Sequence, residues 1–318
     1  MKVIRIVSVA LALSCSVAGR PALADTRVVM LGTGTPVPDH QRAGAGVAVV
    51  YNDKAYLFDV GYGGVQRAIE ASQRLGIAAL APVNVGRLFF THLHGDHTLD
   101  YAELVSTYWW RRPSQIRVWG PRGLGAMTEG MYAMMDQDVS IRLEGSQPIV
   151  NRDAYRVSAT EIEEGPVLEE DGLVIEAFEV SHGDVTPAFG YRITTPEKTI
   201  VISGDTAYSP KLVEAATGVD ILIHETISEE GLSGLEDVWQ QYHLRAHTPT
   251  GALARIAEAA RPKLLVITHV LHYAAPVESA PIVVESAPIV VESAAVESAG
   301  VASTTSGLRA AGFICRTA

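Results

Sequence analysis

Three histidines and one aspartate stand close together in residues 91–97, which read THLHGDH. Neutral imidazoles and carboxylates are the side chains that bind Zn²⁺ in proteins. A catalytic zinc takes about three protein ligands and keeps one position for water, so this segment offers more ligands than one ion needs. The spacing therefore predicts two ions, with His92 and His94 binding one and Asp96 and His97 binding the other.

Three further candidate ligands each follow an apolar segment that is typical of a buried strand: His182, Asp205 and His269. A strand-end histidine alone is more often an ordinary polar residue, but their joint occurrence favours a shared site. Asp205 can give one oxygen to each ion. The predicted first set is His92, His94, His182 and Asp205, and the second set is Asp96, His97, Asp205 and His269. We expect two zinc ions, with Mn²⁺ or Fe²⁺ as alternatives.

The apolar pattern predicts strands alternating with helices in two series. Strands are expected at residues 27–31, 47–51, 55–59, 87–90 and 116–119, with helices at 64–75, 99–110 and 123–135. The second series has strands at 173–180, 189–193, 199–202, 221–224 and 264–268, and a helix at 249–260. Two such series fit an α/β protein in which two sheets face each other between helical layers.

The two ends of the chain differ from this pattern. Residues 1–24 combine a basic start, an apolar stretch and a small-x-small motif ending at Ala24, which predicts a signal peptide and a periplasmic or secreted protein. A lipid anchor on Cys15 is the alternative. The sequence VESAPIV occurs twice within residues 277–290, with prolines that would break a helix. We therefore expect a folded domain over residues 25–273 and a low-complexity tail over residues 274–318 without a catalytic role.

The net charge of the chain indicates which classes of molecule it is expected to bind. The formal net charge is −11, and removal of the three basic residues in residues 1–24 would make it −14. Such a balance repels polyanions at long range, so we expect a small anionic ester substrate and no nucleic acid. Bound metals would still make the pocket locally positive. No second apolar run is long enough to span a bilayer, and a homo-oligomer is left open.

Several motifs give the chain a resemblance to a known family. They are LGTGTP at 31–36, FDVG at 58–61, the H-x-H-x-D-H loop, AFGYR at 188–192, SGDT at 203–206, HET at 224–226 and HTP at 247–249. In this order and spacing they resemble the metallo-β-lactamase superfamily, and specifically its ribonuclease Z-like branch. The resemblance covers roughly residues 28–269.

The resemblance implies a four-layer αβ/βα sandwich with two metals at one end of the sheets. It also implies that His247 and Glu225 lie beside the metals and move protons, and that Asp96 orients the attacking hydroxide as well as binding metal. Asp59 would fix a ligand histidine from the second shell. The alternative for His247 is an ordinary histidine at a helix start.

The substrate is inferred from a departure from that branch. Ribonuclease Z carries a long arm that grips transfer RNA, whereas here only a hairpin's length separates Arg192 from Ser203. The same motifs resemble exported arylsulfatase-like members. We therefore expect an exported dinuclear zinc hydrolase that cleaves small sulfate esters or phosphodiesters. The alternatives are a ribonuclease Z-type phosphodiesterase or endoribonuclease, and a lactonase or β-lactamase acting on a carbonyl. The aromatic and basic residues 108–112 either line its pocket or end a helix on the core.

Overall fold

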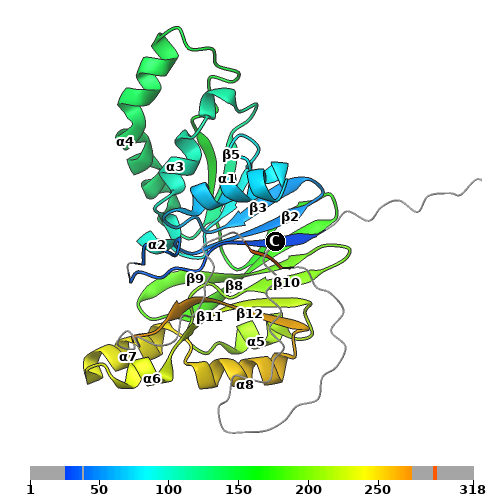
Figure 1. The fold of residues 1–318 in the computed structure, drawn as a ribbon, viewed down its shortest axis with the longest axis vertical. Coiled ribbons are helices and arrows are strands. Elements are labelled where there is room, and N and C mark those ends of the chain that lie inside the picture. Colours follow the sequence, from blue (N-terminus) through cyan, green and yellow to red (C-terminus); the bar gives the residue numbers. More distant parts are fainter. Residues whose placement is uncertain (1–25, 38, 274–288, 292–318) are drawn as a thin grey trace, which may run out of the picture.

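Two β-sheets pack face to face, and helices cover their outer sides (Figure 1). The computed structural model describes residues 26–37, 39–273 and 289–291. Helices α1, α3 and α4 lie on one outer side, and α5 and α8 lie on the other. This confirms the expected four-layer α/β sandwich.

The first sheet has the strand order β13-β1-β2-β3-β4-β5-β6. Its strands are β1 (Arg27–Gly32), β2 (Gly46–Tyr51), β3 (Lys54–Phe58), β4 (Arg87–Phe89), β5 (Ile116–Gly120), β6 (Val157–Glu161) and β13 (Ile289–Val291). Strands β3 to β6 run parallel. Parallel neighbours bring their carboxyl ends to one edge of the sheet, which is where the segment after β3 meets the histidine-rich loop after β4.

The second sheet has the order β12-β11-β10-β9-β8-β7. Its strands are β7 (Gly165–Glu170), β8 (Leu173–His182), β9 (Val185–Thr194), β10 (Thr199–Ile202), β11 (Ile221–Ile227) and β12 (Leu264–Leu271). Strands β10, β11 and β12 run parallel to one another. Strands β11 and β12 continue beyond their expected ends, so Glu225 and His269 lie within strands rather than after them.

The helices agree with the sequence pattern in part. They are α1 (Gly64–Arg74), α2 (Gly95–Thr98), α3 (Tyr101–Ser106), α4 (Leu124–Glu144), α5 (Pro210–Ala216), α6 (Glu229–Ser233), α7 (Asp237–Ala246) and α8 (Thr250–Ala260), with 3₁₀ turns at Ala78–Leu80 and Trp109–Arg111. The helix expected over residues 99–110 is shorter in the structure, because α3 ends at Ser106, where Thr107 adopts an extended conformation. Tyr108 is left-handed and precedes the 3₁₀ turn. Strands β6 and β7 and helices α5, α6 and α7 were not predicted.

The core between the sheets is built on aromatic rings. Phe89 stacks on Phe58 and on Trp119, with ring centroids 5.0 and 4.7 Å apart. Tyr191 from the opposite sheet meets Phe89 edge-on at 5.9 Å, and its hydroxyl donates to the Phe90 carbonyl at 2.8 Å. This hydrogen bond joins the two sheets immediately before the histidine-rich loop begins.

Within residues 108–112, Trp109 and Arg112 are buried and Trp110 packs against the core, whereas Tyr108 is exposed. Trp109 is fully buried, and the buried Arg112 guanidinium donates to the main-chain carbonyls of Pro82, Leu104 and Val105. Burial lowers the pKa of Arg112 to about 10. The expectation of a segment that packs on the core therefore applies to Trp109, Trp110 and Arg112.

One short strand falls within the tail that the sequence predicts to be low in complexity. Strand β13 pairs antiparallel with β1 through Val28–Val291, Val29–Val290 and Met30–Ile289. The predicted signal peptide and the rest of the tail lie outside the described residues. Within the described part of the chain, no helix combines the length and apolarity needed to cross a membrane.

A carboxylate in β7 joins the two sheets at the opposite end from the histidines. Glu170 accepts a hydrogen bond from the Tyr56 hydroxyl at 2.7 Å, lies 2.5 Å from Arg87 Nε, and accepts from Arg117 at 2.8 Å. These three partners come from β3, β4 and β5 of the other sheet.

We expect Glu170→Gln to lower stability by about 1–2 kcal/mol, because hydrogen bonds to a partly buried charged group are worth more than neutral ones. Thermal unfolding should then show a Tm roughly 3–6 °C below that of the parent protein. Glu164→Gln is the matched control, since Glu164 pairs with Lys211 at the exposed surface. An equal Tm for the two variants would contradict this view of Glu170.

Candidate metal centre

The structure brings all seven predicted ligands to one edge of the sandwich. The loop after β4 enters α2 and supplies four of them, while β8, the β10–α5 loop and β12 supply the others from the second sheet. Six of the seven are buried, and His94 is partly exposed. Segments that are far apart in the sequence thus meet at this edge.

The first group of candidate ligands converges on His94. Its Nδ1 atom lies 3.0 Å from His92 Nε2 and 3.2 Å from His182 Nε2. Asp205 Oδ2 lies 4.0 and 3.9 Å from those two Nε2 atoms. Burial lowers the pKa of all three histidines, that of His182 to about 4, so the rings are neutral at pH 7 and keep lone pairs to offer a cation.

The second group surrounds the other side of Asp205. His269 Nε2 lies 3.0 Å from Asp96 Oδ2, and His97 Nε2 lies 3.6 Å from the same oxygen. Asp205 Oδ2 is 3.5 Å from His97 Nε2, and its Oδ1 is 3.4 Å from His269 Nδ1. Burial alone would raise the pKa of Asp205, but His269 and His97 outweigh it and hold that pKa well below its usual range.

Two buried nitrogen atoms without hydrogen-bond partners indicate that these residues fit divalent cations. His97 Nε2 and His269 Nδ1 are buried and have no hydrogen-bond partner among the described residues. Orphaned nitrogen atoms are costly inside a protein, and both of these face the Asp205 carboxylate. A cation between them would satisfy both nitrogens and balance the carboxylate charge.

Neighbouring groups fix the orientation of the rings. Asp59 Oδ2 lies 2.8 Å from His97 Nδ1, and the same carboxylate accepts from the main-chain N–H and the hydroxyl of Thr91. His182 Nδ1 lies 2.8 Å from the Ala246 carbonyl, which leaves Nε2 facing the site. Thr91 and Ala246 were not predicted. A main-chain acceptor leaves no mark on the residue type, whereas Thr91 could have been suspected because it precedes the histidines.

A buried acid–base pair adjoins the histidines. His247 Nδ1 lies 3.4 Å from Glu225 Oε2, and Glu225 Oε1 accepts from the Thr248 main-chain N–H at 2.7 Å. Burial raises the pKa of Glu225; burial would lower that of His247, but contact with Glu225 outweighs it and raises that pKa. The His247 ring lies 5.2 Å from that of His182 and 5.9 Å from that of His269. The pair can hold a proton beside the candidate ligands.

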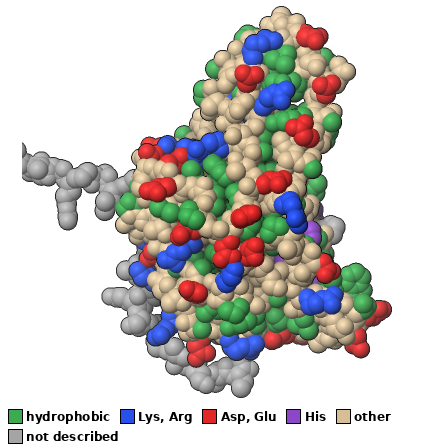
Figure 2. All heavy atoms as spheres, turned by 180° about the vertical axis from the view of Figure 1, so that it is seen from behind, with side chains coloured by type: hydrophobic (Ala, Val, Ile, Leu, Met, Phe, Trp, Pro, Cys, Tyr) green, Lys and Arg blue, Asp and Glu red, His purple; other side chains and the backbone are tan. Residues whose placement is uncertain are grey.

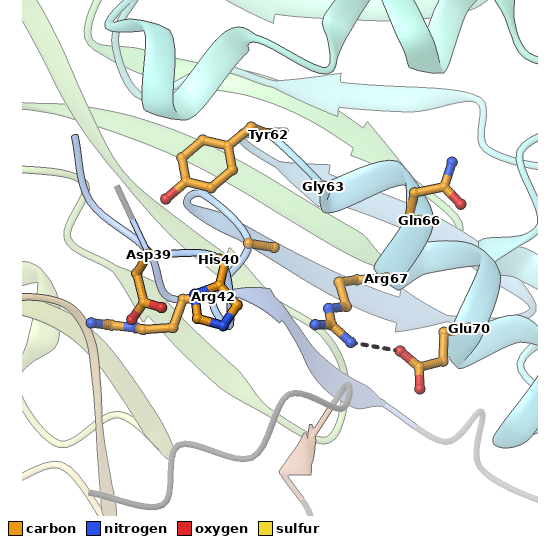
Figure 3. Close-up of a pocket in the computed structure, with 9 residues that line it drawn as sticks. Asp39, His40, Arg42, Tyr62, Gly63, Gln66, Arg67 and Glu70 are labelled. Carbon is orange, nitrogen blue, oxygen red and sulfur yellow. Dashed lines mark hydrogen bonds and ion pairs between the residues drawn. The ribbon is translucent and has the colours of Figure 1, made fainter. Parts of the chain in front are cut away.

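Two hollows border this edge. A cavity of about 370 Å³ is lined by His182, Thr186 and Tyr208 among others, so it shares a wall with the candidate ligands. Figure 3 shows a second pocket, of about 250 Å³, between His40 and Arg42 of the loop after β1 and Arg67 of α1. There Arg67 is paired with Glu70 at 2.8 Å.

Comparison with known proteins agrees with this geometry. The family model described as "Beta-lactamase superfamily domain" matches residues 54–270. The chain belongs to the metallo-β-lactamase superfamily. It is 30% identical to a Ribonuclease Z of Mycobacterium avium over 246 residues, which cover 76% of this chain and 85% of that protein. A Ribonuclease Z of Mycobacterium sp. strain KMS is 29% identical over 260 residues, which cover 80% of this chain and 87% of that protein.

A solved structure shows the same fold. Human tRNase Z, short form, superposes with a TM-score of 0.58 at 24% identity, covering 77% of this chain and 93% of that one. Together with the mycobacterial relatives it supports the ribonuclease Z-like branch of the metallo-β-lactamase superfamily. As a member of this superfamily, the protein is a hydrolase acting on ester bonds.

These relatives correct the predicted substrate. They are ribonucleases, and none of them is named a sulfatase. The expectation of a small sulfate ester or phosphodiester, and of no nucleic acid partner, is therefore wrong. Net charge governs long-range attraction, whereas catalysis depends on the local site. The short connection between Arg192 and Ser203 is real, since only the β9–β10 hairpin lies there, but it does not change the reaction class.

The candidate metal-binding loop packs on a glycine. A Cβ atom on Gly61 would lie 1.9 Å from the Asp96 carbonyl oxygen, which also accepts the Ala45 N–H. No side chain fits there without moving the loop that carries Asp96 and His97.

We expect Gly61→Ala to weaken zinc binding by about 10- to 100-fold, as losses in the surroundings of metal ligands do. Competition with a chromophoric chelator measures the affinity. Gly86→Ala is the control, because a Cβ there meets nothing within 4 Å. If both variants bind zinc as the parent protein does, the loop does not depend on this close approach.

Proposed function

We propose that this chain is a dinuclear metal-dependent endoribonuclease of the ribonuclease Z type. The observation that carries the proposal is the buried convergence of seven candidate ligands around Asp205, beside the His247–Glu225 pair. The mycobacterial relatives, which are named Ribonuclease Z, support RNA as the substrate.

The ligands would divide into two sets that share Asp205. His92, His94 and His182 would bind one ion, and Asp96, His97 and His269 would bind the other. Imidazole with carboxylate favours zinc, with Mn²⁺ or Fe²⁺ as alternatives. Two such ions would lower the pKa of water and stabilise charge on the phosphate oxygens.

The remaining roles fall to the chain's own groups. Asp96 can accept a hydrogen bond from the attacking water with the oxygen that faces His269 and His97, and so orient it. His247 would give its proton to the leaving oxygen, and the buried Glu225 carboxylate keeps that proton on His247 until it is needed. The main-chain N–H of Thr248 holds Glu225 in place.

The face that Figure 2 shows gives the substrate no single basic path among the described residues. Acidic and basic side chains are interspersed there, and a histidine is visible at the edge. We infer that recognition depends on the ions and on groups close to the site. We also propose that residues 1–24 are removed on export to the periplasm, that residues 25–273 form the hydrolase domain, and that the tail of residues 274–318 is dispensable for catalysis.

Metal analysis tests the ligand sets. Since three ligands and the shared carboxylate hold each ion, His182→Ala and His269→Ala should each retain about one zinc after dialysis, and Asp205→Ala should retain neither. Mass spectrometry of the dialysed protein gives the metal content. His272→Ala is the control, because His272 is exposed and outside both sets. Two zinc ions in all of these variants would refute the assignment.

Kinetics test the proton donor. His247→Ala should lower kcat for RNA cleavage about 10²- to 10⁴-fold with the zinc content unchanged, as loss of a general acid does, and Glu225→Gln should act in the same direction. Cleavage of a labelled transfer RNA precursor and of unstructured RNA is followed on gels, with nitrocefin turnover run in parallel. Turnover of nitrocefin but of neither RNA by the zinc-loaded parent protein would contradict the ribonuclease proposal.

A further inference from the structure

Helix α7 carries an exposed group of aromatic side chains next to the candidate metal centre. Trp239 is 53% exposed and Tyr242 is 39% exposed, whereas His243 on the same helix is buried. The Trp239 and Tyr242 rings lie 6.0 Å apart at 87°, and both contact the His243 ring, at 6.2 and 5.1 Å. Large aromatic side chains that lie exposed next to one another often mark a binding surface, because apolar area is more stable when it is covered.

These rings connect directly to the catalytic edge. The His243 ring lies 5.7 Å from that of His247, and the His247 main-chain N–H donates to the His243 carbonyl at 2.8 Å. The ring of Tyr273 adds a further contact to His243 at 5.1 Å. In Figure 1, α7 and α2, which carries the histidine-rich loop, lie at the same edge of the sandwich. The exposed rings therefore continue outward from the residue that would donate the proton.

We propose that Trp239 and Tyr242 form a stacking platform for an unpaired base of the RNA close to the cleaved bond. The proposal rests on the proposed ribonuclease function. Aromatic side chains stack on any base, and each such contact contributes about 1–3 kcal/mol. Glu236 and Asp237 at the start of α7 would repel a phosphate, so the base rather than the backbone faces this helix. Stacking also suits a protein whose charge gives little attraction for RNA.

The platform determines binding of the RNA strand and leaves the chemical step unchanged. We expect Trp239→Ala to lower kcat/KM for RNA about 5- to 100-fold, mainly through KM. Turnover of bis(4-nitrophenyl) phosphate should change less than that of RNA, because that molecule carries no nucleobase to stack on the platform. Trp239→Phe should retain most of the activity. Val238→Ala is the matched control, since Val238 is an exposed apolar neighbour on the same helix.

A double-mutant cycle identifies the occupant. Abasic residues are placed in turn at each position flanking the cleaved bond. At one position, the abasic RNA should lower kcat/KM by as much as Trp239→Ala does. Combining the two changes should then lower kcat/KM no further. Additive losses at every position, or normal RNA cleavage by Trp239→Ala, would overturn the platform. The platform would also be overturned if Trp239→Ala changed the oligomeric state and left RNA kinetics unchanged. That result would assign the surface to a second copy of the chain.

A binding measurement separates this proposal from the ribonuclease function. An RNA in which a methylene group replaces the leaving oxygen of the cleaved bond cannot be hydrolysed there. It should quench tryptophan fluorescence of the zinc-loaded protein, and Trp239→Phe should remove most of that quenching. If the parent protein cleaves no RNA yet shows this quenching, the platform stands and the ribonuclease proposal fails. If it cleaves RNA and the quenching is the same in both proteins, the platform fails alone.

Discussion

The Asp205 carboxylate is the feature on which the rest of this structure depends. It is buried, it stays ionised, and its two oxygens lie within 4.0 Å of nitrogen atoms from His92, His97, His182 and His269. A buried charge requires compensation, and His269 and His97 supply part of it, since they hold the pKa of Asp205 low. Cations shared with these histidines would supply the rest. The apolar sheets and the polar edge therefore depend on each other, because the water-excluding core holds the candidate ligands close together.

The position of this carboxylate also couples metal binding to folding. One set of ligands combines the loop after β4 with β8, and the other combines the same loop with β12, so each ion would join the two sheets. An unfolded chain has no such site, and binding free energy therefore adds to the stability of the fold. At the other end of the sandwich, Glu170 joins the sheets through Arg87, Arg117 and Tyr56 without a metal. The core between these two ends is closed by the Phe89 ring stack.

Much of the site could be predicted because the ligands follow local rules. A four-ligand loop and single histidines or carboxylates at apolar strand exits are visible without tertiary information, whereas the role of Asp59 was implied by the family resemblance. What could not be predicted depends on distant contacts. The Ala246 carbonyl orients His182 from 64 residues away, and β6 is recognisable only by its pairing with β5, because its residues are largely exposed. The extended conformation of Thr107 ends a helix that the apolar pattern alone would have continued.

The error over the substrate has a different origin, since it came from the short connection between Arg192 and Ser203 and from treating net charge as a property of the site. A formal charge of −11 describes the average field of the whole chain. A phosphodiester at the catalytic edge would instead meet two divalent cations and a protonated histidine, all within a few ångströms and shielded from water, where electrostatic interactions are strongest. An acidic surface then reduces non-specific binding to polyanions, while the local cations still attract the reacting phosphate. Acidic composition and ribonuclease chemistry are therefore compatible, and such an enzyme must obtain the rest of its affinity from contacts that carry no charge.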